Sequence, residues 1–432
     1  MLAGFRADRP PMSSSPTLPD PSGGGAAASR ASDAATPVVS SFYDRFPYPG
    51  DPLQDGPPPG YNWRWCVDSA RAYAFGSLPR RDAGGERRWR ILDAGCGTGV
   101  STDYLCHLNP GSQVLAVDIS EGALAVARER CRRSGAAERV RELRIEQRSL
   151  LDLGEESGFD YINSVGVLHH LDRPEAGLRA LAERLAPNGL LHLFLYADGG
   201  RWEIHRTQRA LALLGAGGDG DGLRLGRQLL AELPEGNRLR RHHEERWALD
   251  TAADSNFADM YLHPQETSYD LARLFAFIGG SGLRFAGFSN PEVWDPARLL
   301  AGELLERARA LPAERQWELV ESLDPAISHF EFFLSPSTPP LQQASDEALL
   351  TSAFERNPCL WGWPGTSLLG PDLQPLDLEA ADEPLLQAVE AAPQTPLGQL
   401  PLAMEAGERA ERARRLLRDR VLLRLAGAEQ AA

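Results

Sequence analysis

Short apolar runs alternate with segments of helical periodicity through the middle of the chain. The runs are bounded by turn-forming residues, which predicts buried strands. The predicted strands are residues 89–94 (WRILDA), 113–119 (QVLAVDI), 142–149, 159–165 and 190–196 (LLHLFLY). Alternation of strands with helices favours right-handed crossovers and a parallel sheet that is covered on both faces. The pattern therefore predicts an α/β fold.

The helices between these strands carry recognisable ends. Ser120 predicts the N-cap of the helix after the second strand, and Gly135 its end. Pro174 predicts the first turn of a helix that reaches Leu185, and the sequence PNG at 187–189 is expected to close it.

The chain departs from this alternation after residue 196. Residues 199–266 are largely helical in pattern and Arg-rich, and the glycine-rich sequence at 215–222 predicts a flexible interruption. We expect 199–266 to form an inserted helical lid over the substrate side. Further on, the pattern predicts a helix at 267–278, strands at 283–288 and 330–334, and helices from 296 to 323 between these two strands.

The two ends of the chain differ from the middle in composition. Residues 1–40 are rich in Pro, Ser, Gly and Ala, which predicts a disordered leader. Residues 41–60 carry too much Pro and Gly for regular structure, yet their four aromatic side chains predict a strap that packs on the core, followed by a helix at 61–75. At the other end, helical patterns at 383–391 and 406–425 predict a small helical or winged-helix-like appendage in 337–432.

Bulk composition narrows the classes of function. The 432 residues exceed what one core usually organises, which indicates a main domain with additions. A net charge of −15 argues against general binding to nucleic acid. The five cysteines have no zinc-like or paired spacing, so we expect reduced thiols, no metal site and a cytoplasmic protein. No apolar run reaches the roughly 18 residues of a membrane helix, so no membrane partner is expected.

The strongest chemical signal is the sequence DAGCGTG, residues 93–99, between a strand and a helix. Its glycines let the backbone approach a ligand where a side chain would clash. Asp118 closes the next strand, where a carboxylate can accept hydrogen bonds from ribose hydroxyls. The glycines follow G-x-G-x-G, which disfavours a nicotinamide dehydrogenase. These features predict an adenosine-type ligand.

Four ordered motifs resemble those of bacterial class I S-adenosylmethionine-dependent methyltransferases. They are LDAGCGTG (92–99), AVDISEGALAVAR (116–128), FDYINSVGVLHHL (159–171) and LAPNGLLHLFLY (185–196). The resemblance implies a Rossmann-like, seven-stranded, mostly parallel sheet with helices on both faces and an antiparallel last strand. It also implies that 89–336 is a methyltransferase domain, with 41–88 as its N-terminal strap and helix.

The same resemblance implies a set of cofactor-binding positions. Asp93 and the backbone of the glycine-rich turn would line the methionine part of S-adenosylmethionine, Asp118 would hold the ribose and Ile119 would pack on the adenine. At the adenine amino group the family often has an acidic or amide residue, whereas this chain has Ser149. The implied set is Asp93, Gly95, Cys96, Gly97, Gly99, Asp118, Ile119, Ser149, Leu150, Ser164, Val165 and Tyr43. Tyr43, with Tyr48, is expected either to close over the cofactor or to anchor the strap.

Three residues are candidates for catalysis, because they follow the fourth and fifth strands where an acceptor approaches: His169, His170 and Tyr196. The alternative for the two histidines is a backbone-bonded helix entry. Two further polar groups are candidates for substrate contact or for a lid plug: Arg201 with His205, and Asp259 with Tyr261 and His263. His329 heads an apolar strand and is expected to lie in the core.

The reaction follows from the resemblance. A sulfonium methyl group is already activated, so in-line displacement needs alignment and exclusion of water, with a base only for a protonated acceptor. The acceptor is expected to be a small molecule or a protein. The stretch from residue 259 to 288 resembles the region after the catalytic domain in bacterial methyltransferases with a regulatory segment, some of which act on protein lysines. The alternative is a non-catalytic S-adenosylmethionine-binding sensor or scaffold.

Overall fold

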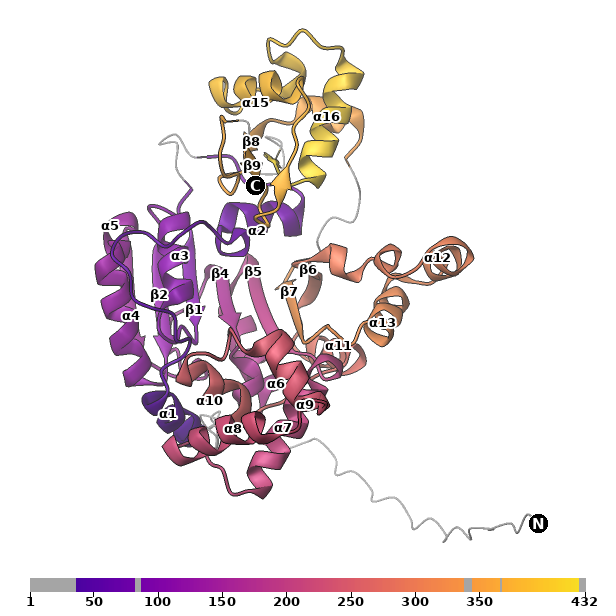
Figure 1. The fold of residues 1–432 in the computed structure, drawn as a ribbon. Coiled ribbons are helices and arrows are strands. Elements are labelled where there is room, and N and C mark those ends of the chain that lie inside the picture. Colours follow the sequence, from indigo (N-terminus) through magenta and orange to yellow (C-terminus); the bar gives the residue numbers. More distant parts are fainter. Residues whose placement is uncertain (1–35, 82–86, 338–343, 366, 427–432) are drawn as a thin grey trace, which may run out of the picture. The chain divides into compact units, whose positions relative to one another are not determined.

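The centre of the structure is a seven-stranded sheet (Figure 1). The computed structural model describes residues 36–81, 87–337, 344–365 and 367–426. The strands of the sheet are β1 (Arg90–Ala94), β2 (Gln113–Asp118), β3 (Glu142–Gln147), β4 (Phe159–Val165), β5 (Leu185–Tyr196), β6 (Arg284–Phe288) and β7 (His329–Ser335). Their order is β3-β2-β1-β4-β5-β7-β6, and β7 runs antiparallel to both of its neighbours. The Rossmann-like sheet and its antiparallel last strand are confirmed.

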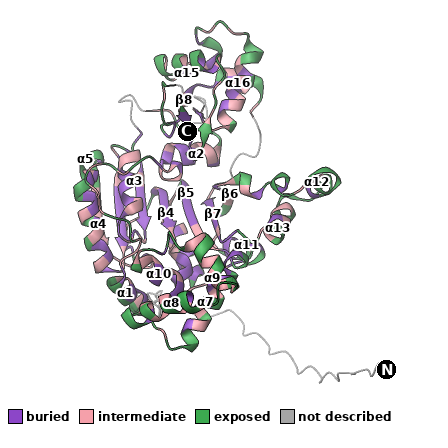
Figure 2. Ribbon diagram, viewed as in Figure 1, coloured by how far each residue is buried: buried purple, intermediate pink, exposed green. Residues whose placement is uncertain are grey.

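Burial explains why the apolar runs form the middle of this sheet. In β1, Leu92 pairs with Leu115 of β2 on one side and with Ile162 of β4 on the other, and all three side chains are almost fully buried. Figure 2 shows the central strands as the most buried part of the fold. Complete burial of one such side chain contributes about 1.5–3 kcal/mol, so these runs are stable only inside a sheet covered on both faces.

The helices that connect the first five strands are α3 (Val100–Leu108), α4 (Glu121–Ser134), α5 (Ala136–Arg139) and α6 (Pro174–Ala182). Ser120 caps α4 as predicted, because its hydroxyl accepts a hydrogen bond from the Ala123 N–H at 3.0 Å. At the other end Gly135 takes the left-handed conformation with φ 74°.

Two predictions near β5 are wrong. Helix α6 ends at Ala182 instead of Leu185, and the sequence at 187–189 lies within β5 instead of closing a helix. The reason is that Leu185 already pairs with Phe159 of β4, with a register shift before the next pair. Tertiary pairing has therefore overridden the local turn signal.

The N-terminal segment is more regular than its composition suggests. Residues 36–40 were predicted to be disordered and 41–60 irregular, but Thr36–Arg45 forms helix α1. Val39 and Phe42 are buried on one face of α1, and this packing stabilises a helix that has weak local signals. The remainder of the predicted leader, 1–35, lies outside the described residues. The predicted helix at 61–75 begins only at Val67 (α2, Val67–Phe75), after a 3₁₀ turn.

The segment between β5 and β6 is helical, as predicted. After a 3₁₀ turn at Gly199–Arg201 come α7 (Trp202–Leu213), α8 (Gly220–Glu232), α9 (Arg238–His242), a π-helical turn (His243–Trp247) and α10 (Asp254–Leu262), and then α11 (Leu271–Gly279). The glycine-rich interruption is shorter than predicted, because Asp219 accepts a hydrogen bond from the Gly222 N–H at 2.8 Å and starts α8. Helices α12 (Gly302–Arg309) and α13 (Ala313–Leu323) lie between β6 and β7 in the sequence. No described helix is long and apolar enough to span a bilayer.

The C-terminal segment, predicted as a helical or winged-helix-like appendage, contains both helices and short strands. It contains α14 (Asp346–Thr351), β8 (Phe354–Arg356), β9 (Leu368–Leu369), β10 (Pro375–Leu376), α15 (Asp382–Ala391), α16 (Ala406–Arg418) and β11 (Leu422–Arg424). The helix predicted at 406–425 ends at Arg418, since the chain then turns and β11 pairs antiparallel with β8. Buried apolar residues from these helices form a hydrophobic cluster of their own. The extent of the appendage as a domain stays a prediction.

Candidate active site

A cavity of about 570 Å³ opens at the carboxyl ends of β1, β2, β4 and β5. Its lining runs from the glycine-rich turn and Asp118 at one end to Asp259 and Tyr196 at the other. In parallel α/β sheets, ligands bind at this edge. The size suits a ligand of several rings together with a second molecule.

The glycine-rich turn forms the floor of one half. Gly95, Cys96 and Gly97 line the cavity, and both glycines have positive φ, 83° and 52°. A Cβ atom on Gly97 would lie 2.4 Å from the Tyr48 carbonyl oxygen, which accepts a hydrogen bond from the Thr98 N–H at 3.0 Å. Residue 97 must lack a side chain because the backbone of the strap crosses the turn at this position.

Gly99 has a packing role in addition to the one predicted. It does not line the cavity, and it precedes α3 with φ 81°. A Cβ atom there would lie 2.8 Å from the Cα of Ala127 in α4. Gly99 therefore allows α3 and α4 to approach each other, and its predicted role at the ligand stays a prediction.

Asp93 also lies beneath the cavity instead of lining it. Its carboxylate accepts hydrogen bonds from the hydroxyls of Ser101 (2.7 Å) and Thr102 (2.6 Å) and from the Asn163 amide (2.8 Å). Burial raises the pKa of Asp93, against the effect of these donors. Asp93 joins β1, α3 and β4 and thereby positions the turn, and its contact with the methionine part of the cofactor stays a prediction.

Polar groups continue across the sheet from this point. The Asn163 side-chain oxygen lies 2.9 Å from Nδ1 of the buried His192, and Nε2 of His192 lies 3.2 Å from the Glu331 carboxylate. Glu331 also contacts Arg64 at 2.6 Å. Burial alone would raise the pKa of Glu331, but His192 and Arg64 lower it to about 2. The network ties β1, β4, β5 and β7 together below the site.

Asp118 faces the cavity as predicted. One carboxylate oxygen accepts from the Gly97 N–H and the other from the Ser120 N–H, both at 2.9 Å. Burial raises its pKa, and these two backbone donors oppose that effect. Each carboxylate oxygen keeps a further acceptor position, so Asp118 can hold two hydroxyl groups of a ligand.

The rest of this half follows the prediction, with one exception. Ile119, Ser149, Leu150 and Val165 line the cavity. Ser164 is fully buried and does not line it. The alternation of side chains along β4 turns the Ser164 side chain to the side opposite Val165. The prediction rested on the backbone carbonyl of Ser164, which the side-chain direction does not test.

Helix α1 covers this half. Thr36, Val39 and Tyr43 face the cavity, and Tyr48 follows from the strap. Two polar side chains fix the helix: Ser40 donates to the Ile119 carbonyl at 3.1 Å, and Asp44 accepts from the Ser120 hydroxyl at 2.7 Å. The two tyrosines therefore both close the cavity and anchor the strap.

The opposite half is built around Asp259 of α10, which is 3% exposed. Tyr43 donates to its carboxylate at 2.8 Å and Tyr196 at 3.4 Å. Burial raises the pKa of Asp259, and the pKa values of both tyrosines are raised by burial and by this carboxylate. His170 lines the cavity beside them.

Arg201 also lines this half of the cavity. Its guanidinium lies 3.5 Å from the centre of the Tyr196 ring. It donates to Glu266 at 3.2 and 3.0 Å, and His205 lies 3.2 Å from the same carboxylate. Burial would raise the pKa of Glu266, but His205 and Arg201 lower it to about 2. Arg201 is thus held by a carboxylate of its own.

Comparison with known proteins agrees with this geometry. A family model described as a methyltransferase domain matches residues 92–191. An uncharacterized protein of Synechococcus sp., syc1184_c, is 50% identical over 362 residues, which are 82% of this chain and 85% of that protein. A ubiquinone biosynthesis O-methyltransferase of Ruegeria pomeroyi is 36% identical over 113 residues, 26% of this chain and 43% of that protein.

A solved structure supports the same fold. PKMT2 from Rickettsia typhi superposes with a TM-score of 0.57 at 17% identity, covering 85% of this chain and 77% of that one. PKMT2 in complex with AdoHcy gives 0.54 at 19% identity, covering 71% and 58%. This chain belongs to the class I S-adenosylmethionine-dependent methyltransferases. S-adenosylmethionine is the cofactor of that family.

The residues at the glycine-rich end of this methyltransferase fit that cofactor. The backbone of Gly95 and Gly97 leaves room for a chain, Asp118 offers two acceptors suited to ribose hydroxyls, and Ile119 and Leu150 form apolar walls suited to a purine. The other half of the cavity is then left for a methyl acceptor.

His169 is not placed as a catalytic residue of the methyltransferase. Its side chain is fully buried, does not line the cavity, and stacks on Tyr196 with ring centres 3.8 Å apart. Both ring nitrogens lack a hydrogen-bond partner among the described residues, and burial lowers its pKa well below the usual value. The prediction of a catalytic His169 does not fit this position, whereas His170 and Tyr196 both face the cavity.

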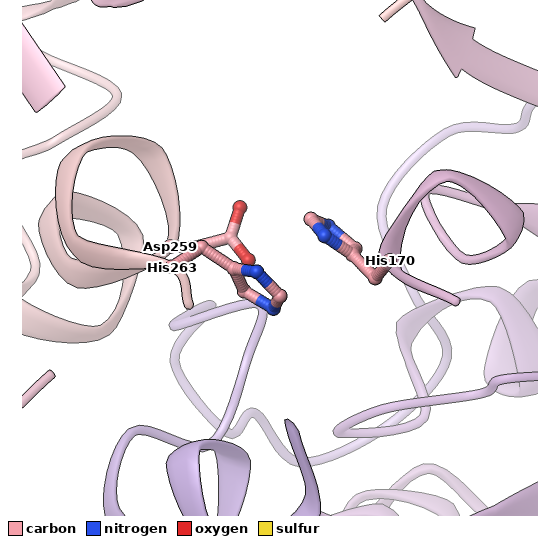
Figure 3. A group of neighbouring side chains, drawn as sticks. All are labelled: His170, Asp259 and His263. Carbon is pink, nitrogen blue, oxygen red and sulfur yellow. The ribbon is translucent and has the colours of Figure 1, made fainter. Parts of the chain in front are cut away.

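His170, Asp259 and His263 lie close enough together to be considered as a metal site. Figure 3 shows the His170 ring opposite Asp259 and His263, with one potential ligand atom from each within 4.8 Å of the others. The two imidazole rings, however, are 3.8 Å apart between centres and inclined at 34°. Ring nitrogens bind a metal in the ring plane, about 2.0–2.1 Å away for zinc, and rings so nearly face to face do not direct two lone pairs at one ion.

The hydrogen bonding of His263 also argues against a metal ion. Its Nδ1 accepts from the Gln265 N–H at 3.1 Å, so the proton of the neutral ring is on Nε2. Burial lowers the pKa of His263. The group therefore does not suit a metal ion.

Some residues of the acceptor half were not predicted. His329 was expected in the core, but it faces the cavity and stacks on Phe194 at 4.5 Å. The alternation of side chains along β7 could have predicted this position. His329 and Glu331 lie on one face of the strand, and Phe330 and Phe332 lie on the other. Trp65 and Trp247 also line this half, and no local pattern distinguishes them from core tryptophans.

Proposed function

We propose that this protein transfers the methyl group of S-adenosylmethionine to an acceptor that binds between Tyr196, His170 and Asp259. The observation that carries the proposal is that a single cavity joins the glycine-rich turn and Asp118 to these polar side chains. A site that served only to bind the cofactor would need no second, buried polar half. No finding favours a non-catalytic sensor.

The chain's own residues have three tasks in this proposal. The cofactor, when bound, supplies a methyl group on a positively charged sulfur. Helix α1 and the strap exclude water through Val39, Tyr43 and Tyr48. Tyr196 and Asp259 orient the acceptor, and Asp259 takes its proton if it arrives protonated.

The test measures transfer directly. Purified protein is incubated with S-adenosylmethionine carrying a labelled methyl group and with two acceptor pools, the small molecules and the proteins of a bacterial lysate. We expect S-adenosylhomocysteine to form together with a labelled product in one pool. Asp118→Asn serves as the matched control with impaired cofactor binding. Tight cofactor binding without transfer to either pool would contradict the proposal.

A further inference from the structure

The acceptor half of the cavity holds a buried carboxylate that forms no ion pair among the described residues. Asp259 is 3% exposed, and its hydrogen-bond donors are the hydroxyls of Tyr43 and Tyr196. A ring nitrogen of His170 and one of His263 lie within 4.8 Å of its carboxylate. A buried carboxylate without a positive partner is unfavourable, so a cation that enters the cavity is stabilised there.

Arg201 offsets the charge of this carboxylate only in part. Interactions with His170 and Arg201 lower the pKa of Asp259, against the larger effect of burial. The Arg201 guanidinium lines the cavity, but its hydrogen bonds, at 3.2 and 3.0 Å, go to the Glu266 carboxylate.

His170 provides a second hydrogen-bond acceptor next to Asp259. Its Nδ1 lies 2.8 Å from the Gln265 carbonyl oxygen. A carbonyl only accepts, so Nδ1 carries the hydrogen, and in the neutral ring the lone pair is on Nε2. Figure 3 shows this ring directed toward Asp259 from the opposite side. The wall therefore offers two acceptors that face one space, which suits a molecule with at least two N–H donors.

Aromatic side chains surround these acceptors. Six of them line the cavity: Tyr43, Tyr48, Trp65, Phe194, Tyr196 and Trp247. Aromatic faces attract a cation more strongly when water is excluded. Asp250, Arg201 and Arg246 also line the cavity. Beside Asp259 and His170, the carboxylate, the ring lone pair and the aromatic faces together suit an ammonium group on an apolar stem.

We infer that the methyl acceptor is an amine, which binds as its ammonium ion against Asp259 and His170. This inference rests on the proposed methyl transfer and names the class of acceptor. A carboxylate acceptor would bring a second negative charge next to Asp259, and a neutral hydroxyl would leave the buried charge unpaired. An amine, whether a free molecule or a side chain of a protein, satisfies the charge and both acceptors.

The transfer step balances with these groups. The ammonium ion gives one proton to the Asp259 carboxylate, whose raised pKa favours accepting it. The nitrogen lone pair then forms a bond to the methyl carbon, while the carbon–sulfur bond breaks and leaves its electron pair on sulfur. The products are the methylated ammonium ion and neutral S-adenosylhomocysteine, and the proton on Asp259 passes to solvent.

The first test measures binding and does not depend on turnover. Thermal shifts of the protein with S-adenosylhomocysteine are recorded against n-butylamine and n-butanol, which differ in charge but hardly in size. We expect the amine to act at concentrations at least about tenfold lower than the alcohol, and the difference to vanish in Asp259→Asn. Glu245→Gln, which removes an exposed charge from the lid, is the matched control and should keep the difference. Equal shifts, or no shift with the amine, would overturn the inference.

The second test separates the acceptor from the cofactor's own positive sulfur. Asp259→Asn should bind S-adenosylmethionine and S-adenosylhomocysteine as the unmodified protein does, while the transfer rate falls at least about hundredfold. A loss of affinity for S-adenosylmethionine alone would assign the carboxylate to the sulfonium and refute the amine. Tyr43→Phe, which keeps the ring, should lower the rate less.

The third test identifies the product atom and the source of the amine. Labelled product from the lysate pools is hydrolysed, and the labelled species is identified by mass spectrometry against N-methyl, O-methyl and S-methyl standards. We expect the label on nitrogen, and the pool in which it appears tells a free amine from a protein side chain. Transfer with the label on oxygen, sulfur or carbon would leave the proposed function intact and overturn the amine.

Discussion

The ribose assignment of Asp118 can be tested by Asp118→Asn, which keeps the size of the side chain and removes its charge. In the structure the two carboxylate oxygens accept from the Gly97 and Ser120 N–H groups at 2.9 Å, and the remaining acceptor positions face the cavity. Hydrogen bonds to a charged group contribute about 1.5–3 kcal/mol, compared with about 1 kcal/mol for neutral partners.

The expected effect follows from two ribose hydroxyls. If each bond to the carboxylate loses about 1–1.5 kcal/mol with a neutral amide, the cofactor loses about 2–3 kcal/mol, or about 30- to 150-fold in affinity. The amide also brings an N–H group against one of the two backbone donors. Leaving that donor unpaired costs the folded state about 1–3 kcal/mol, so a lower melting temperature without ligand is part of the expectation.

Isothermal titration calorimetry with S-adenosylhomocysteine measures the affinity, and circular dichroism with temperature verifies folding. Glu121→Gln is the matched control, because Glu121 lies at the exposed start of α4 and pairs only with an exposed Arg128 in the described contacts. The control should keep its affinity within about twofold. A folded Asp118→Asn protein with unchanged affinity would refute the reasoning.

Four further variants test other parts of the structure. Asp259→Asn should gain stability relative to the unmodified protein as the pH rises above about 3.8, because the pKa of Asp259 is raised and its ionisation penalises the folded state. Melting temperatures of both proteins across the acidic range measure this difference. A difference that does not change with pH would contradict the prediction. Glu331→Gln should lower the free energy of unfolding by about 3 kcal/mol at neutral pH, since the pKa of Glu331 is lowered from 4.5 to about 2. The stabilisation from this ionised carboxylate is complete above about pH 4.5 and disappears toward pH 2. Urea unfolding should therefore show a smaller difference between the two proteins at pH 4 than at pH 7. Gly99→Ala should cost at least about 1–2 kcal/mol through its left-handed backbone, with little change in cofactor affinity; lost affinity in a fully folded protein would speak for a direct ligand contact. His169→Phe should keep the melting temperature and leave transfer within a few-fold, since it removes two unpaired buried nitrogens and keeps a stacked ring; inactivity of the folded variant would return His169 to the catalytic set.

The central sheet was predictable because its signals are local. The central strands β1, β2 and β4 are apolar runs, and the position of Asp118 at the end of β2 places it at the edge of the sheet where ligands bind. The turn was predictable for the same reason. Which of its residues touch the cavity was not, because Asp93 and Gly99 are directed by contacts with α3, α4 and β4 that come from other parts of the chain.

Helix α1 shows why the N-terminal prediction failed. Its sequence has two adjacent valines and three Ser or Thr residues, which weaken a helix in isolation. What stabilises it are distant partners: the Phe42 ring lies 5.0 Å from the ring of His263, and Tyr43 donates to Asp259 across 216 positions in the sequence. Long-range contacts of this kind leave no periodic trace in the segment itself.

In the acceptor half, the individual residues could be predicted from the sequence, but their arrangement could not. The polar and aromatic sequence around Asp259 was unusual enough to be singled out, and it does enter the site. Its partners Tyr43, His170 and Tyr196 come from α1, from the turn after β4 and from the end of β5. The sequence identified the members of the cluster separately, and only the fold determines that their atoms meet.

The strap changes how a familiar test of the glycine-rich turn has to be interpreted. Gly97→Val looks like a direct block of the cofactor, yet a Cβ atom at Gly97 meets the Tyr48 carbonyl at 2.4 Å before it meets any ligand. The side chain would displace Tyr48 and Pro49, which the Thr98 N–H and hydroxyl hold at 3.0 and 2.7 Å. Loss of binding in that variant would therefore report an opened strap as readily as an occluded pocket. Asp118 does not share this ambiguity, because its replacement by Asn leaves the path of the strap untouched.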